Sequence, residues 1–368
     1  MKYKKYNFHF ISSLTAGFIF SSFLLYNFLI IKEINPEEDL LNPGTSVLFE
    51  SADGIKIHCK GYSDINECID FYKKNNVESL SVWFGNSQLH AINQYKNGQK
   101  TSTLLLNELL KNKGDNLFTL SFGNANIIEH SIQLIYLINQ INIDRVILSL
   151  VFDDSREGEL RDDVFKFIEI DSFTSETLKK YKSGQKLIND KNSNILEYES
   201  SKNLQILLES YLDESLNSIS ELWNQRSEIS YYFFTTLRKI RNYIFNIKPT
   251  TIRKIIPKNY DKNLNFLEIF LEESLINKVD VIMYIAPIRN DIDLPYLDDE
   301  YLKFKKDIYS MSKLYNNVTY LNLEDIVPPE NWGQKNSTTL NDDLELDFMH
   351  FNYEGHLILA NKLDSILN

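Results

Sequence analysis

Short apolar runs alternate with amphipathic stretches over most of the chain after residue 78. Five of the runs are predicted to be strands, at residues 79–85, 117–123, 145–152, 279–287 and 318–323. Strands that are apolar throughout and separated by helical stretches are typical of a parallel sheet covered by helices on both faces. The pattern therefore predicts an α/β protein with a three-layer α/β/α fold. A helix is expected to close it over residues 353–367, where apolar residues recur with a period near 3.6.

The strand pattern stops between about residues 155 and 262. Apolar residues recur there every three or four positions, which predicts amphipathic helices. We expect a helical insertion in the α/β domain. It is either a cap that buries apolar surface or a lid or partner-docking surface, and the cap is favoured because helical insertions need no function to persist.

The N-terminal segment has the features of a membrane anchor. Lys2, Lys4 and Lys5 precede residues 8–31, which contain no Asp, Glu, Lys or Arg. About 20 apolar residues in a helix cross a bilayer. The run is longer than the core of a cleaved signal peptide, and no clear A-x-A site follows it. We expect residues 1–32 to be a cytoplasmic stub and an uncleaved transmembrane helix, rather than a signal peptide or a buried core helix.

Charge around this segment predicts where the remaining chain lies. The lysines should stay in the cytoplasm, while the acidic residues 37–39 follow the span. Residues 33–45 are polar and carry Pro36 and Pro43, as expected of a tether. We therefore expect a single-pass protein whose domain, residues 46–368, is extracytoplasmic, either periplasmic or on the cell surface.

Composition excludes several classes of protein. The 368 residues are 43% hydrophobic and 24% charged, the balance of a globular chain. A net charge of -12, with no long Lys/Arg block beyond the first residues, excludes an ordinary nucleic-acid binder. No zinc-ligand spacing or phosphate-binding glycine loop occurs, so no metal and no cofactor is expected. Cys59 and Cys68 are either bridged in an oxidising compartment or free.

Ser87 stands in the segment WFGNSQLH, residues 83–90, directly after a predicted strand and a Gly-Asn turn. At the carboxyl end of a parallel strand the next helix begins, and its free N–H groups can stabilise an oxyanion. A serine there is well placed to attack a carbonyl. Serine is also a common helix N-cap, and taken alone this second interpretation is favoured.

Asp347 and His350 lie in the segment DFMHFNYEGH, just before the closing helix. A hydrolytic triad needs an imidazole to take the serine proton and a carboxylate to hold the ring in the right tautomer. A spacing of three residues allows one loop to bring both groups to the serine. Asp-x-x-His also occurs by chance, and a surface loop with a structural histidine is the alternative. The other histidines are expected to be structural.

Together, Gly85-Asn86-Ser87-Gln88 and Asp347-Phe348-Met349-His350 resemble the SGNH (GDSL) hydrolase superfamily, in motif order and position, over about residues 78–368. The resemblance implies a three-layer α/β/α fold with Ser87 as nucleophile, His350 as base and Asp347 as the carboxylate that orients it.

The superfamily's oxyanion-hole positions match less well. Gly123 stands where a glycine N–H would join the N–H of Ser87, although it is equally a simple turn glycine. The superfamily's Gly-x-Asn is absent, and Asp153 and Asp154 occupy that place. Nearby amides, Asn126 or Asn124, are the candidates to replace the missing asparagine, and Asn126 completes the predicted hole.

The anchor, the insertion, YIAPIRND at residues 284–291 and the terminal motif resemble a narrower group. Its members are the D-alanyl transfer protein of teichoic acid loading systems and membrane-bound SGNH proteins of polysaccharide O-acetylation. This resemblance implies a membrane-anchored serine acyltransferase or esterase. It would transfer or remove an acetyl or similar O-acyl group on a cell-envelope polysaccharide, through an acyl-serine intermediate, beside a membrane-bound O-acyltransferase.

Two alternatives stay open. One is a plain extracytoplasmic esterase or lipase, and the other is a non-catalytic envelope scaffold that binds glycan or the O-acyltransferase. Arg289 either binds an anionic substrate group or forms a surface ion pair, and the ion pair is favoured.

Overall fold

A computed structural model describes residues 45–59, 62–75, 77, 80–191, 226–248, 251–335 and 344–367. The predicted anchor, residues 1–32, and the tether up to residue 44 lie outside this part of the chain. Within the described ranges, no helix combines the length and the apolar character that a bilayer crossing requires.

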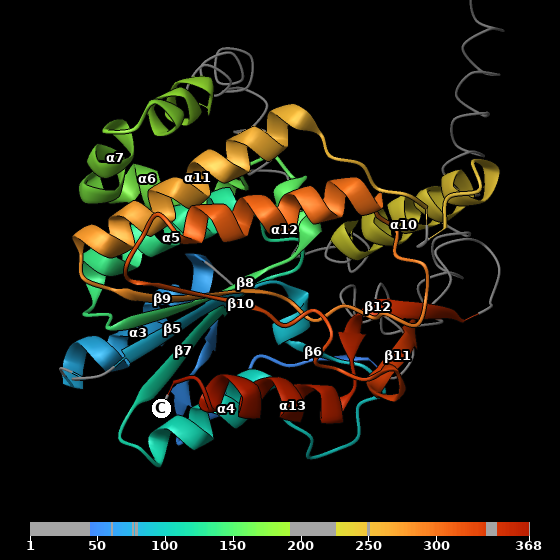
Figure 1. The fold of residues 1–368 in the computed structure, drawn as a ribbon, viewed down its shortest axis with the longest axis horizontal. Helices are drawn as coiled ribbons and strands as arrows, with labels where there is room; N and C mark the ends of the chain where they lie inside the picture. Colours follow the sequence, from blue (N-terminus) through green and yellow to red (C-terminus); the bar gives the residue numbers. More distant parts are fainter. Residues whose placement is uncertain are drawn as a thin grey trace, which may run out of the picture.

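A parallel sheet of six strands forms the centre of the protein, as the sequence predicted (Figure 1). The order across the sheet is β10-β9-β8-β5-β7-β4, and every neighbouring pair is parallel. The strands are β4 (His58–Cys59), β5 (Leu80–Gly85), β7 (Asn116–Ser121), β8 (Arg145–Leu150), β9 (Asp280–Ile285) and β10 (Val318–Asn322). The five predicted strands are confirmed, whereas the two-residue edge strand β4 is too short to show in a hydrophobic pattern.

Helices cover both faces of the sheet, because alternate residues of each strand pack in opposite directions. In β5, Val82 and Phe84 belong to one hydrophobic core and Trp83 to the other. The first core is covered by α3 (Tyr62–Asn75), α5 (Ile127–Gln140), α6 (Asp162–Ile170), α11 (Pro257–Ile276) and α12 (Asp298–Ser312). The second core is covered by α4 (Ser102–Lys111) and α13 (Tyr353–Asp364), which lie below the sheet in Figure 1.

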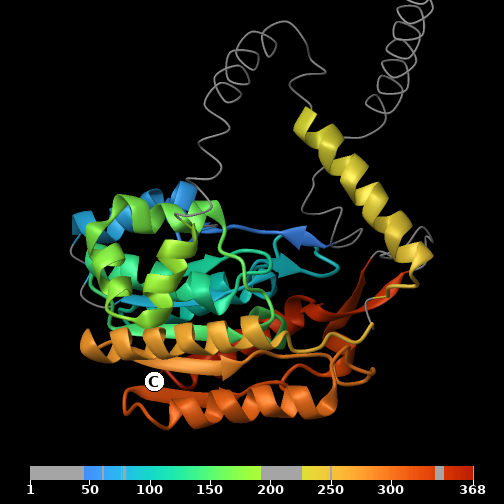
Figure 2. The same ribbon diagram turned by 90° about the horizontal axis from the view of Figure 1, so that it is seen from above.

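The described part of residues 155–262 is largely helical. Besides α6, it contains α7 (Ser172–Lys179), a helical stretch at 182–191, α10 (Arg226–Ile244) and the start of α11. Helices α6 and α7 pack on α5 and bury apolar side chains such as Phe167 and Leu178. Helix α10 lies at one end of the molecule, away from α6 and α7 (Figures 1 and 2).

In the described part of the chain, three pairs of short antiparallel strands lie outside the main sheet. They are β1 (Ser46–Val47) with β6 (Ala91–Ile92), β2 (Ser51–Ala52) with β3 (Ile55–Lys56), and β11 (Trp332–Lys335) with β12 (Glu345–Phe351). A short 3₁₀ turn, η1 (Ser87–Leu89), follows β5, and another, η2 (Phe152–Ser155), follows β8.

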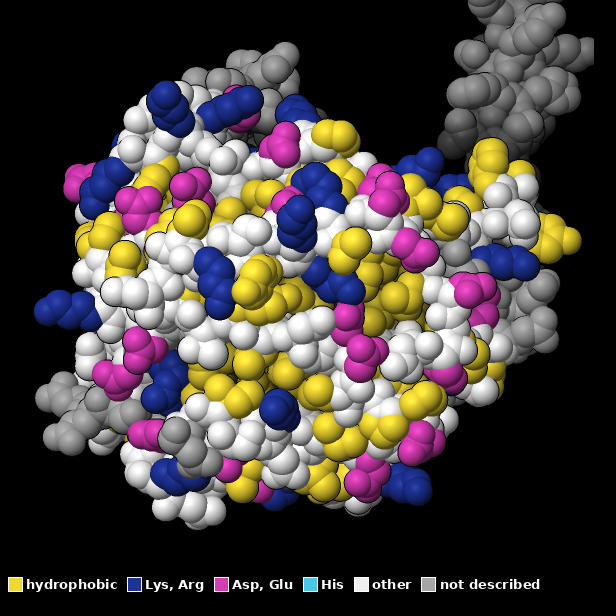
Figure 3. Space-filling model, in the orientation of Figure 1, with side chains coloured by type: hydrophobic (Ala, Val, Ile, Leu, Met, Phe, Trp, Pro, Cys, Tyr) yellow, Lys and Arg dark blue, Asp and Glu magenta, His cyan; other side chains and the backbone are white. Residues whose placement is uncertain are grey.

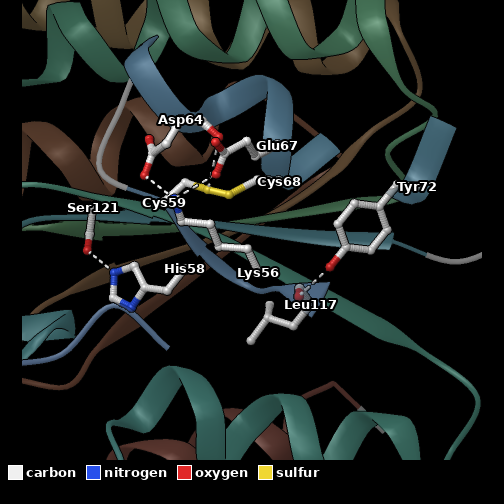
Figure 4. Close-up of a disulfide and its surroundings, with 9 residues drawn as sticks. All are labelled: Lys56, His58, Cys59, Asp64, Glu67, Cys68, Tyr72, Leu117 and Ser121. Carbon is white, nitrogen blue, oxygen red and sulfur yellow. Dashed lines mark hydrogen bonds and ion pairs between the residues drawn. A yellow bond between two sulfur atoms is a disulfide. The ribbon is translucent and has the colours of Figure 1, made fainter. Parts of the chain in front are cut away.

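A disulfide between Cys59 and Cys68 joins the edge strand β4 to α3 (Figure 4). Both cysteines are fully buried. Close by, Lys56 pairs with Asp64 at 3.0 Å, and the Tyr72 hydroxyl donates to the Leu117 carbonyl at 3.1 Å. The sequence left open whether these cysteines are bridged, and the structure shows that they are.

Candidate active site

Ser87 lies at the carboxyl end of the central strand β5, where η1 begins. The N-cap of η1 is Asn86, whose side-chain oxygen accepts from the Gln88 N–H at 3.1 Å. Gly85 is required by close packing, since a Cβ there would lie 2.5 Å from Leu89 Cδ1. Because Asn86 performs the capping, the Ser87 hydroxyl is not used as the cap.

Asp347 and His350 lie in strand β12 instead of the expected loop. Trp332 of β11 is opposite Phe351 and Gln334 is opposite Leu346, so residues 347–350 face Gly333 alone. They therefore form a bulge, which redirects side chains out of strand alternation. Asp347 Oδ1 holds the bulge by accepting from the N–H groups of Met349 (2.8 Å) and His350 (3.1 Å).

The three predicted side chains form one hydrogen-bonded chain. His350 Nδ1 lies 2.9 Å from Asp347 Oδ2, and His350 Nε2 lies 2.9 Å from Ser87 Oγ. An ionised Asp347 requires the proton on Nδ1, so Nε2 accepts from the serine hydroxyl. This arrangement is the one that activates a serine for nucleophilic attack.

The charge of Asp347 is protected by its surroundings. Burial acts to raise the pKa of this carboxyl, but the charge and hydrogen bond of His350, with the nearby Lys335 ammonium, outweigh it and lower the pKa to about 2. Asp347 is 1% exposed and His350 is 8% exposed, while Ser87 is half-buried. The carboxylate of Asp347 therefore stays ionised and shielded from solvent. Ser87 is the most accessible of the three hydrogen-bonded side chains.

Gln88, which the sequence did not single out, joins the two motifs. Its Nε2 donates to the Pro287 carbonyl and to the Met349 carbonyl, both at 2.8 Å. The side chain is completely buried. One amide group thus fixes η1 to the bulge of β12, which sets the position of Ser87 relative to His350. A glutamine directly after the candidate nucleophile is the only sequence signal for this role.

Asp154 supports the turn that carries Ser87. Asn86 Nδ2 donates to Asp154 Oδ1 at 3.2 Å, and the Val151 N–H donates to Oδ2 at 3.0 Å. Burial raises the pKa of Asp154 well above its ordinary value. Asp153 belongs to a separate network, accepting from the Tyr296 hydroxyl at 3.0 Å and pairing with Arg253.

Gly123 lies at the carboxyl end of the parallel strands, where a residue of the predicted oxyanion hole must lie. Gly85 is paired with Ser121, so Gly123 follows β7 beside the turn that carries Ser87. Its carbonyl accepts from Arg161 Nη1 at 3.1 Å, and open space lies where a Cβ would be. A part for its N–H and that of Ser87 in an oxyanion hole stays a prediction.

Asn126 is the N-cap of α5. Its Oδ1 accepts from the Glu129 N–H at 3.0 Å, and its Nδ2 donates to the Glu159 carbonyl at 2.8 Å. The residue is 2% exposed, and neither of these bonds is to Ser87 or His350. Its predicted part in the oxyanion hole therefore gains no supporting contact and stays a prediction.

Two cations flank Phe348 inside the bulge. Arg253 lies 5.2 Å and Lys335 Nζ 5.3 Å from the ring centroid. Burial lowers the pKa of Lys335, and the charge of Asp347 partly opposes this effect. Among the described residues, no cluster of three His, Cys, Asp or Glu side chains is arranged to hold a metal ion.

Arg289 makes the ion pair that the sequence favoured, from a buried guanidinium to the exposed carboxylate of Asp291. Its guanidinium binds both carboxylate oxygens of Asp291, at 2.6 and 3.0 Å, and donates to the Gly333 carbonyl at 3.0 Å. With 7% of its surface exposed, Arg289 helps to fix Gly333, the residue opposite the bulge. Its side chain is therefore structural.

The other buried histidines beside the site have partners within the protein. His58 Nε2 and His90 Nδ1 lie 2.5 and 2.8 Å from the Ser121 hydroxyl (Figure 4 shows the first of these). His356 accepts from the Ser102 N–H at 3.0 Å, and its Nε2 lies 3.2 Å from the Ala91 carbonyl. These contacts are consistent with structural roles.

Two solved structures that this chain resembles are distant from it in sequence. No protein-family profile and no curated protein matches the sequence. A protein of Bacteroides fragilis assigned as an acylhydrolase is 10% identical, with a TM-score of 0.37 over 82% of this chain and 95% of that one. A carbohydrate esterase family 2 enzyme of Corynascus thermopiles (Myceliophthora fergusii), with a carbohydrate-binding domain, is 9% identical, with a TM-score of 0.36 over 79% of this chain and 67% of that one. Likenesses at this level do not establish a shared activity, so the assignment below rests on the geometry of residues 87, 347 and 350.

Proposed function

We propose that this chain is a serine-dependent acyl-transfer enzyme that cleaves carboxylic esters through an acyl-Ser87 intermediate. The observation that carries the proposal is the unbroken chain of hydrogen bonds from Asp347 through His350 to Ser87. A serine and an Asp-x-x-His pair separated by 263 positions rarely meet in this order and geometry unless the serine is to be activated.

The geometry supports an ordinary sequence of steps. Ser87 Oγ attacks the ester carbonyl while His350 Nε2 takes its proton, and Asp347 stabilises the imidazolium that forms. Backbone N–H groups at the start of η1, with that of Gly123, are the candidates to stabilise the oxyanion. His350 then returns the proton to the leaving alcohol. The acyl group passes from Ser87 to water or to an acceptor hydroxyl, which His350 deprotonates in turn.

For the substrate, the proposal is an O-acyl ester of a cell-envelope polysaccharide, handled by a membrane-anchored enzyme beside a membrane-bound O-acyltransferase. The apolar run at residues 8–31 supports anchoring. The Cys59–Cys68 disulfide supports an extracytoplasmic location, because disulfides persist mainly in oxidising compartments.

Covalent labelling tests the nucleophile directly. Wild-type protein treated with a fluorophosphonate probe should carry one adduct on the peptide that contains Ser87, and it should hydrolyse a short acyl ester. Ser87→Ala should lose both properties. Ser365→Ala, which removes an exposed hydroxyl on the last turn of the chain, should keep both. An adduct on another residue, or an active Ser87→Ala protein with the correct fold, would refute the proposal.

Acceptor dependence separates transferase from esterase. A transferase should release little free acid until a sugar hydroxyl is supplied, whereas a plain esterase releases acid at once. If the protein were instead a non-catalytic scaffold, cells that produce the Ser87→Ala variant would still show normal acylation of the polymer.

A further inference from the structure

Helix α10 exposes apolar side chains to an unusual degree. Phe234 is 66% exposed, Ile244 67% and the following Phe245 71%. Phe233, Leu237 and Tyr243 are also exposed. Single exposed apolar residues are common on protein surfaces, but a contiguous group on one helix marks an interaction site.

Three of the exposed apolar residues share one face of the helix, and Phe234 and Tyr243 flank that face on its two sides. At about 100° per residue, Phe233, Leu237 and Ile244 fall within an arc of about 40°. Asn242, which is only 4% exposed, lies on the opposite side. A helix on a water-facing surface has the reverse arrangement, with its polar face outward. The outward face of α10 is therefore suited to an apolar environment.

The same segment is strongly basic. Residues 233–248 contain Arg238, Lys239, Arg241 and Lys248 and no Asp or Glu, whereas the whole chain has a net charge of -12. None of these four cations is paired with an acidic side chain in the part of the chain that the structure describes. Figure 3 shows hydrophobic and basic side chains together at the right of the molecule, where α10 lies.

Helix α10 also lies at the end of the molecule that carries the candidate active site. In both ribbon views α10 is at the same end as β11 and β12, and β12 contains Asp347 and His350 (Figures 1 and 2).

We infer that α10 is an interfacial helix, whose exposed face binds the surface of an anionic lipid bilayer. Aromatic and aliphatic side chains enter the boundary between headgroups and acyl chains, and arginine and lysine bind the anionic headgroups. A second copy of the chain fits less well, because pairing two such faces would bring together two sets of four unpaired cations. One consequence rests on the proposed function: binding through α10 brings Ser87 towards esters held at the membrane.

Site-directed spin labelling of the full-length protein tests the inference. The two native cysteines are paired in a disulfide, so a single introduced cysteine can be labelled selectively. Ile244→Cys reports on α10. Leu302→Cys is the matched control, since Leu302 is an exposed apolar residue of similar accessibility (64%) on α12. Each labelled protein is reconstituted in vesicles of phosphatidylcholine with one third phosphatidylglycerol, and in phosphatidylcholine alone.

In the anionic vesicles, the label at 244 should gain accessibility to oxygen and lose accessibility to a water-soluble nickel chelate, while the label at 302 stays aqueous. Replacing Arg238 and Arg241 by Gln should lower the equilibrium constant for insertion of the helix about 25-fold, at about fivefold for each charge.

Three results would overturn the inference: an aqueous label at 244, a label shielded from both reagents, as contact with protein would produce, or equal insertion in phosphatidylcholine alone. Ser87→Ala should leave the spectra unchanged, so the inference and the proposed function can fail separately.

Discussion

Asp347→Asn tests whether the carboxylate sets the tautomer of His350. Asparagine keeps Oδ1, so the N–H groups of Met349 and His350 keep their acceptor and the bulge should persist. The second oxygen, 2.9 Å from His350 Nδ1, becomes an NH₂ group. A donor there requires Nδ1 to accept, which moves the ring proton to Nε2. The base then donates towards Ser87 instead of accepting from it.

The expected loss is large for catalysis and moderate for stability. Loss of the correct tautomer should lower kcat by about 10⁴-fold, or about 5.5 kcal/mol in the barrier. The pKa of Asp347 falls from 3.8 to about 2 on folding, which corresponds to about 2 kcal/mol of stabilisation at neutral pH. Because the folded pKa is the lower one, this stabilisation is present above pH 3.8 and is lost as the pH falls towards 2.

Ester hydrolysis and urea unfolding measure the two effects. The difference in unfolding free energy between wild type and Asp347→Asn should be at its maximum at pH 6 and should decrease between pH 4 and pH 2. Asp53→Asn is the control, because Asp53 also carries a charge that is paired, with Lys111 at 2.8 Å, but is 81% exposed, so this substitution should change stability little. An Asp347→Asn protein that keeps a tenth or more of the wild-type kcat would refute this account of the site.

Three further predictions concern the support of the site and of the fold. Gln88→Met leaves the carbonyls of Pro287 and Met349 without their hydrogen-bond donor. We therefore expect kcat to fall at least tenfold and the free energy of unfolding to fall by about 1–3 kcal/mol. Gln185→Met, which changes an exposed glutamine, should have little effect on either quantity. Replacing both cysteines of the disulfide by serine should cost about 2–3 kcal/mol in urea unfolding, since the bridge closes a short loop of sequence separation 9; an unchanged midpoint would contradict this. Burial lowers the pKa of three histidines to about 3: His58, His130 and His356. Their pKa in the folded protein lies below the unfolded value of about 6.5, so the free energy of unfolding should fall as the pH drops below 6.5. The expected loss is about 1.4 kcal/mol per pH unit for each histidine. A urea midpoint that stays constant between pH 7.5 and 5.5 would refute this.

Hydrophobic patterning located the central sheet well, because most residues of its longer strands are apolar. The start of each of the five predicted strands lies within one residue of the structure, and their ends within two. The pattern did not show β12, whose apolar residues are interrupted by Asp347 and His350, or β11, its partner. Pairing between short segments is a tertiary effect that local periodicity does not encode.

The order of the motifs was enough to predict which side chains meet. Ser87 and His350 come together because the closing segment folds back over the end of the central strand. The supporting residues could not be predicted in the same way. Asn86 capping η1, Gln88 bridging two carbonyls and Asp154 lying under the turn all depend on buried geometry. The oxyanion hole depends on the directions of backbone N–H groups, for which residue types give little information.

The bond between Ser87 and His350 joins residues separated by 263 positions. A polypeptide cut short before residue 350 therefore has the nucleophile but no base. Contacts this distant in sequence form late, after the sheet between them has assembled. The hydroxyl should consequently stay unreactive through biogenesis, and any C-terminal truncation that removes β12 should yield an inert protein whatever its remaining structure.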